Sequence, residues 1–114
     1  MAPLEEMAFE QRGDVVVARV RGEVDLSNAA SVKEQLLGSV PNTASVLVLD
    51  LSDTEYLDSS GLHLIFELVQ RLGHRGQRIE LVVPDDSVIN RLLVLTEMNR
   101  VVPMSNSVDA VLPN

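Results

Sequence analysis

The sequence contains no cysteine, and this absence excludes disulfide-stabilised scaffolds, zinc sites built on cysteine and thiol catalysis. Aromatic residues make up only 3% of the chain and tryptophan is absent, so the chain offers no platform on which nucleic-acid bases stack. The unbroken apolar runs, such as residues 46–49, are far shorter than the roughly 20 residues of a membrane-spanning helix. The first residues also lack the basic and then apolar pattern of a secretory signal, and we expect a cytoplasmic protein.

Positive charge is scarce as well. Lys and Arg number 9 against 17 Asp and Glu, which gives a formal net charge of −8 at pH 7. Long-range repulsion therefore opposes binding to nucleic acid. The single lysine, Lys33, does not belong to a phosphate-binding loop motif. We expect a protein partner, no direct insertion into a membrane, and a monomer when the protein is free.

The composition that remains is typical of one globular domain, with 46% apolar and 23% charged residues in 114. Short runs rich in β-branched residues alternate with segments of helical periodicity, which is typical of an α/β domain. We expect strands near residues 7–11, 15–21, 46–51, 78–83 and 101–104, the third of them buried on both faces because it does not alternate. We expect helices near residues 29–40, 60–72, 88–96 and 108–112, the first capped by Ser27 or Asn28 and the third by Asp85 or Asp86.

These elements predict a mixed, mostly parallel β-sheet of four to five strands with about four helices packed mainly on one face. We expect a single domain over residues 1–114, with its core at about 9–112 and a flexible N-terminal extension at 1–6. Gly73 is expected to form the left-handed C-terminal cap of the second helix. The buried stripe of that helix is predicted to contain Leu62, Ile65, Phe66, Val69 and Leu72, and its outer face His63, Glu67, Gln70 and Arg71.

A polar segment after the third strand carries the clearest functional signal. The carboxyl ends of parallel strands are where such sheets bind ligands, and Asp58 and Ser59 follow one of them at the predicted start of a helix. Free N–H groups there favour a negative charge, so a phosphate on Ser59 is expected to gain about 0.3–1 kcal/mol. It adds about −1.5 to −2 charges beside Asp58 and Asp25. The alternative is that the serine only caps the helix.

Three stretches resemble the STAS-domain anti-sigma factor antagonists of bacteria. They are Gly22-Glu23-Val24-Asp25, the segment from Val48 to Leu51 with Leu57-Asp58-Ser59-Ser60-Gly61-Leu62, and the exit Val82-Val83-Pro84 into the following helix. The resemblance extends from about residue 15 to residue 112 and implies a STAS-like fold.

The resemblance implies a partner switch without catalysis, cofactor or metal. In this family the unphosphorylated protein binds an anti-sigma factor that is also a serine kinase, and thereby releases a sigma factor. The kinase then phosphorylates a serine that corresponds to Ser59, and a phosphatase reverses the reaction. The expected partner-binding residues are Glu23, Asp25, Asp58, Ser60, Gly61 and His63. An alternative for the same fold is an accessory subunit of a membrane lipid-transport ATPase that is not phosphorylated.

His63 departs from the family pattern, which favours a small residue at this position. It lies one helical turn after Ser59, where an imidazole can pair with a phosphate, crowd a partner or simply face solvent.

A serine hydrolase built on Ser59, His63 and Asp58 is disfavoured, since Leu57 stands where a nucleophile elbow requires glycine. The carboxylates of Asp50, Asp53, Glu55 and Asp58 match no EF-hand spacing and indicate a solvated acidic loop.

Overall fold

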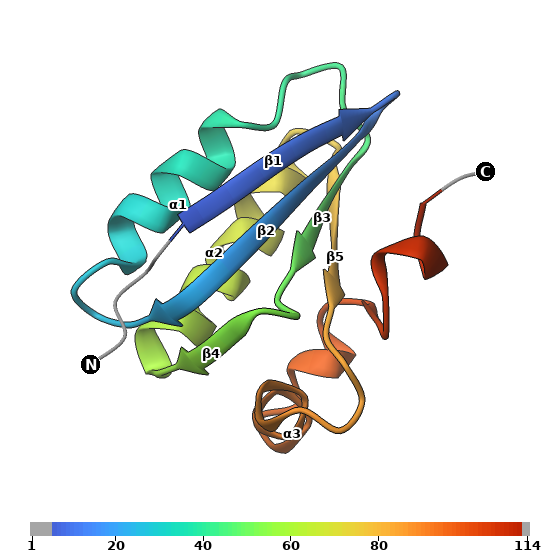
Figure 1. The fold of residues 1–114 in the computed structure, drawn as a ribbon. Coiled ribbons are helices and arrows are strands. Elements are labelled where there is room, and N and C mark those ends of the chain that lie inside the picture. Colours follow the sequence, from blue (N-terminus) through green and yellow to red (C-terminus); the bar gives the residue numbers. More distant parts are fainter. Residues whose placement is uncertain (1–5, 113–114) are drawn as a thin grey trace.

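A computed structural model describes residues 6–112, which form one α/β layer structure (Figure 1). Strands and helices follow one another in chain order as β1 (Glu6–Arg12), β2 (Val15–Val24), α1 (Ala29–Gly38), β3 (Val46–Asp50), β4 (Thr54–Leu57), α2 (Ser59–His74), β5 (Arg78–Val82), α3 (Val88–Leu95), the 3-10 helix η1 (Met98–Arg100), β6 (Met104–Ser105) and the 3-10 helix η2 (Val108–Ala110).

The sheet is mixed and mostly parallel, as predicted. Its strand order is β1-β2-β3-β5-β6, and β4 pairs with the end of β2 beyond the reach of β3. Only the β1–β2 hairpin is antiparallel among the described strands, and Gly13 supplies the positive φ of 62° that its turn requires. The strand β4 was not predicted, because two of its four residues are exposed and no hydrophobic alternation marks it.

The helices α1 and α2 cover one face of the sheet, behind β1 and β2 in Figure 1, which confirms the predicted one-sided packing. The buried apolar side chains between them and the sheet form the main core, to which α3 contributes Ile89 and Leu93. On the opposite face a smaller cluster of five valines from β2, β3 and β5 packs against Val108, Val111 and Leu112. A single 3-10 turn thus covers this face where a fourth α-helix was predicted.

The helix α2 differs from the prediction in which face it buries. Its buried residues are Gly61, Leu64, Ile65, Leu68 and Leu72. Phe66 was predicted to be buried but is 42% exposed. Leu62 and Val69 pack only partly against the core. The helix also continues through Gly73, and the left-handed glycine that follows its end is Gly76, with φ of 72°.

Other element boundaries also differ from the prediction. The cap of α3 is Ser87, whose Oγ accepts from Asn90 N at 3.0 Å, where Asp85 or Asp86 had been predicted. The last strand covers Met104–Ser105 only, because Val101 ends the 3-10 helix η1 as its C-cap and residues 101–103 form a turn. Glu6 is part of β1 and pairs with Arg21, so the predicted N-terminal extension does not include it, and residues 1–5 lie outside the described part of the chain.

Candidate functional site

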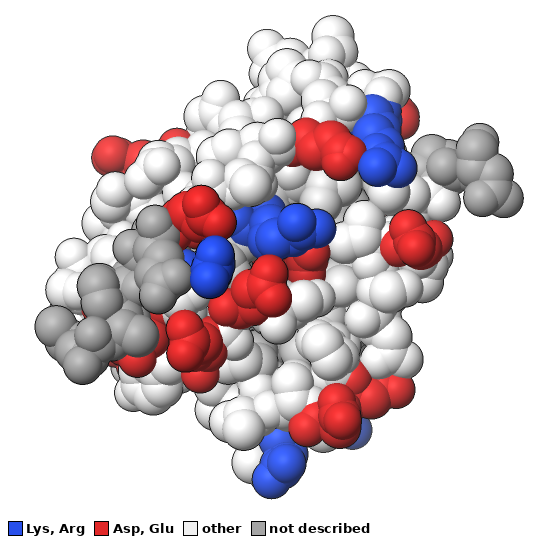
Figure 2. Space-filling model, viewed as in Figure 1, with Lys and Arg blue, Asp and Glu red and all other residues white. Residues whose placement is uncertain are grey.

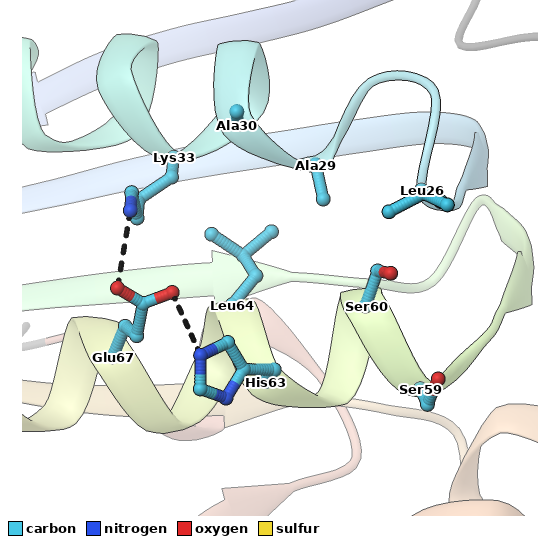
Figure 3. Close-up of a pocket in the computed structure, with 9 residues that line it drawn as sticks. All are labelled: Leu26, Ala29, Ala30, Lys33, Ser59, Ser60, His63, Leu64 and Glu67. Atoms are coloured by element: carbon cyan, nitrogen blue, oxygen red, sulfur yellow. Dashed lines mark hydrogen bonds and ion pairs between the residues drawn. The ribbon is translucent and has the colours of Figure 1, made fainter.

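Ser59 is the first residue of α2, at the edge of the sheet where the parallel strands end. The chain leaves β3, forms the short strand β4, and enters the helix through Asp58. The side chain of Ser59 is exposed, and its hydroxyl makes no hydrogen bond to any residue between 6 and 112. Ser60 is half-buried and points toward the loop that carries Leu26 (Figure 3). The two serines of the motif therefore face different surroundings.

Asp58 caps the helix, and its carboxylate joins two separate segments. One oxygen, Oδ1, accepts from Ser60 N at 2.8 Å and from Gly61 N at 3.1 Å. The other oxygen, Oδ2, accepts from Leu26 N at 3.1 Å, across 32 positions in the sequence. The cap is thus Asp58, and the alternative that Ser59 itself caps the helix is wrong.

This geometry also corrects the expected effect of the helix N-terminus on a phosphate. The N–H groups of Ser60 and Gly61 already donate to the Asp58 carboxylate. These two N–H groups are therefore not free to stabilise an anion on Ser59, and the Asp58 carboxylate places a negative charge beside it.

The loop between β2 and α1 is held by a small hydrogen-bond network. Asn28 Oδ1 accepts from Asp25 N at 3.0 Å, and Asn28 Nδ2 donates to Glu23 O at 2.9 Å. Asp25 Oδ1 accepts from Ser27 N at 2.9 Å. Within residues 6–112, the carboxylates of Glu23 and Asp25 form no ion pair. Of these two predicted partner-binding residues, Glu23 therefore lies at the end of β2 and Asp25 on the ordered loop that follows it.

Gly61 was predicted to let a partner approach closely, and the structure gives its small size an internal reason. The residue is buried, and a Cβ atom there would lie 2.9 Å from Leu57 Cδ2 and 3.2 Å from Val24 O. Only glycine allows α2 to pass this close to β2 and β4. Contact between Gly61 and a partner stays a prediction.

A shallow hollow of about 370 Å³ lies between the first turns of α1 and α2 (Figure 3). Glu67 lies at the far end of this hollow, between the side chains of Lys33 and His63. Its Oε2 is 3.1 Å from Lys33 Nζ and its Oε1 is 3.2 Å from His63 Nε2. The hydrogen bond from Lys33 is the main cause that lowers the pKa of Glu67 below its ordinary value. His63 therefore lines the same hollow as Ser59, but its side chain pairs with Glu67, one helical turn further along α2.

These contacts do not assemble a catalytic triad or a metal site. Asp58 is bound to backbone N–H groups and His63 to Glu67, so Ser59, His63 and Asp58 do not form a hydrolase triad. Asp50 was expected in a solvated acidic loop, but it is the buried last residue of β3 and pairs with Arg19 at 3.1 Å. No group of three or more potential ligands suited to a metal ion occurs among the described residues.

The sheet face that α1 and α2 leave uncovered carries both signs of charge side by side (Figure 2). Arg78 pairs there with Glu80 at 3.4 Å and Arg12 with Glu10 at 2.8 Å. Across the part of this face that the structure describes, the basic groups are thus matched by acidic ones, which does not suit nucleic acid. In the described residues, no helix has the length and apolar character needed to cross a membrane.

Comparison with known proteins fits this arrangement. The family model described as "STAS domain" matches residues 6–111. This chain belongs to the STAS domain family. The resemblance inferred from the sequence is thereby confirmed.

Relatives of this STAS domain carry regulatory names. It is 32% identical over 87 residues to the anti-sigma-F factor antagonist RsfB of Mycobacterium tuberculosis, covering 75% of this chain and 69% of RsfB. It is 29% identical over 97 residues to the anti-sigma-B factor antagonist of Listeria monocytogenes, covering 85% and 84% of the two chains. The crystal structure of an anti-sigma factor antagonist from Mycobacterium paratuberculosis superposes with a TM-score of 0.80 at 26% identity, covering 92% of this chain and 88% of that one.

Proposed function

We propose that this STAS domain is a cytoplasmic anti-sigma factor antagonist: it binds an anti-sigma factor of the serine-kinase type and releases a sigma factor. Phosphorylation of Ser59 ends the binding, and a phosphatase restores it. The observation that carries the proposal is the exposed hydroxyl of Ser59, which no group within residues 6–112 engages, in the segment Asp58-Ser59-Ser60-Gly61. An accessory subunit of a lipid-transport ATPase has no need of such a hydroxyl, and we therefore prefer the regulator. The domain acts by binding and not by catalysis.

The phosphorylation step requires only that the kinase reach the hydroxyl. Ser59 Oγ attacks the γ-phosphorus of ATP, its proton passes to a base on the kinase, and the bond to the β,γ-bridging oxygen breaks to release ADP. The product carries about −1.5 to −2 charges at pH 7. Because Asp58 already occupies the N–H groups of Ser60 and Gly61, the phosphate stays on the surface and adds to the charge of Asp58 and Asp25. A partner matched to the neutral hydroxyl then meets a charge that is costly to desolvate.

The test uses three variants and one purified serine-kinase anti-sigma factor of the organism that encodes this chain. Incubation with ATP should add one phosphate to the unmodified protein and none to Ser59→Ala, as measured by intact mass. Ser107→Ala is the matched control, since Ser107 is also exposed, and it should be phosphorylated normally. Ser59→Ala should bind the anti-sigma factor and Ser59→Asp should bind at least about tenfold more weakly. Equal affinity of all forms, or phosphate on Ser59→Ala, contradicts the proposal.

A further inference from the structure

Leu26, in the loop between β2 and α1, is 82% exposed and stands among polar residues. It borders two hollows. The first is the hollow between α1 and α2 described above, which Leu26 shares with Ser59 and Ser60. The second has a volume of about 480 Å³ and is lined by Leu26 together with Asp25, Ser27, Tyr56 and Asp58. Leu26 therefore forms a ridge between the two hollows, and we call this feature the Leu26 ridge.

Exposure of one leucine is common and proves nothing by itself. Leu95, on α3, is 79% exposed and lines neither hollow. The Leu26 ridge differs because its backbone is fixed: Leu26 N donates to Asp58 Oδ2 at 3.1 Å, and the flanking Asp25 is bound to Ser27 and Asn28. Because this backbone is already ordered, a partner that buries Leu26 does not have to order the loop as well.

The charges around the ridge define the chemistry of the partner. Asp25 Oδ1 is used within the loop, whereas no hydrogen bond of the described residues involves Asp25 Oδ2. At the end of β2, Glu23 carries a second carboxylate for which the described part of the chain supplies no ion-pair partner. An apolar side chain flanked by such acidic groups fits a surface that has an apolar socket with Lys or Arg at its rim.

We propose that Leu26 is the main apolar contact residue of the partner-binding surface, and that it inserts into an apolar socket with a basic rim on the anti-sigma factor. This inference rests on the proposed function and adds the residue that dominates the affinity. Because Leu26 and Ser59 line one hollow, a partner seated on the Leu26 ridge also covers the hydroxyl of Ser59. Phosphorylation of Ser59 then places its charge inside the contact made by Leu26.

The test compares Leu26→Ala with the matched control Leu95→Ala, which removes the same atoms from an equally exposed leucine elsewhere. The dissociation constant for the purified serine-kinase anti-sigma factor is measured for both and for the parent protein. Truncation of a dominant contact residue typically costs tenfold or more, so we expect Leu26→Ala to weaken binding by roughly 10–100-fold. Leu95→Ala should change it by less than about twofold. Leu26→Met, which keeps an apolar side chain of similar volume, should restore most of the affinity.

The outcomes separate this inference from the proposed function. If the parent protein binds, Ser59→Asp does not, and Leu26→Ala binds as tightly as the parent, the inference is wrong and the proposed function stands. Equal losses for Leu26→Ala and Leu95→Ala also overturn it, since Leu26 would then have no special place. If the parent protein binds none of the anti-sigma factors of its organism, both proposals fail. Thermal unfolding of Leu26→Ala should match the parent, because the side chain is exposed.

Discussion

The two carboxylate oxygens of Asp58 bind different segments of the chain, and this leads to a specific prediction for the variant Asp58→Asn. Asparagine caps a helix about as well as aspartate, so its carbonyl oxygen keeps the bonds from Ser60 N and Gly61 N. The amide nitrogen then faces Leu26 N, and two donors meet where Oδ2 accepted at 3.1 Å. The substitution therefore separates the helix cap from the attachment of the Leu26 loop.

The expected loss of stability combines one hydrogen bond and one charge. A hydrogen bond to a charged acceptor contributes about 1.5–3 kcal/mol when it is protected from water. Water competes at the exposed Leu26 amide, so we expect about 1 kcal/mol from this bond. Removing the negative charge from the helix N-terminus costs about 0.3–1 kcal/mol more. The free energy of unfolding should fall by about 1–2 kcal/mol, which corresponds to roughly 4–8 °C in Tm for a domain of this size.

Amide hydrogen exchange measured by NMR distinguishes the two roles of the carboxylate. In Asp58→Asn the amide of Leu26 should exchange faster, whereas the amides of Ser60 and Gly61 should keep their protection. Asp58→Ala is the comparison variant, since it removes both roles and should expose all three amides. If the Leu26 amide exchanges at the same rate in the parent protein and in Asp58→Asn, the carboxylate does not hold the loop and the reasoning is refuted.

Two further predictions concern the packing and the charge of α2. Gly61→Ala should lower the free energy of unfolding by about 1–3 kcal/mol, because its Cβ meets buried Leu57 and a backbone oxygen. The helical control Gly73→Ala, with open space around its Cβ, should raise it by about 0.5–1 kcal/mol, and equal denaturant midpoints for both would contradict the packing argument. Lys33→Met should raise the pKa of Glu67 toward its ordinary value of 4.5, as followed by NMR titration of the carboxyl carbon. The pKa of Glu67 is lower in the folded than in the unfolded protein, so the ionised carboxylate stabilises the parent protein above about pH 4.5. This contribution is lost as the pH falls through the folded-state pKa. An unchanged Glu67 pKa in Lys33→Met would exclude Lys33 as the cause.

The elements that the sequence predicted best are those with one dominant signal. The strand β3 has five buried residues in succession, and its lack of alternation predicted burial on both faces. The helix α2 was located correctly but its buried face was not, because apolar residues surround much of its circumference. Leu64 and Leu68 compete with Leu62 and Phe66 for the same periodic pattern. Only the position of the sheet decides which of them is covered.

The parts of the site that escaped prediction depend on contacts between distant segments. The strand β4 forms because β2 continues past β3 and pairs with it, with Thr54 Oγ1 donating to Val20 O at 2.7 Å. The bond from Leu26 N to Asp58 likewise joins two loops that no local pattern connects. A weak signal for Leu26 was present, since an apolar residue stands alone among Asp25, Ser27 and Asn28. Local sequence patterns were enough to locate Ser59. Only the structure shows that Asp58, and not Ser59, caps the helix.

The strand β2 pairs with β1, β3 and β4, and this has a consequence for the order in which the domain folds. Its hairpin with β1 closes locally, whereas the pairing of Val15 with Val46 encloses the whole of α1. The entropy of closing that longer loop must be overcome before the parallel sheet gains any contact. We therefore expect the hairpin to form first, and the edge that presents Asp25 and Ser59 to be completed when β4 joins β2.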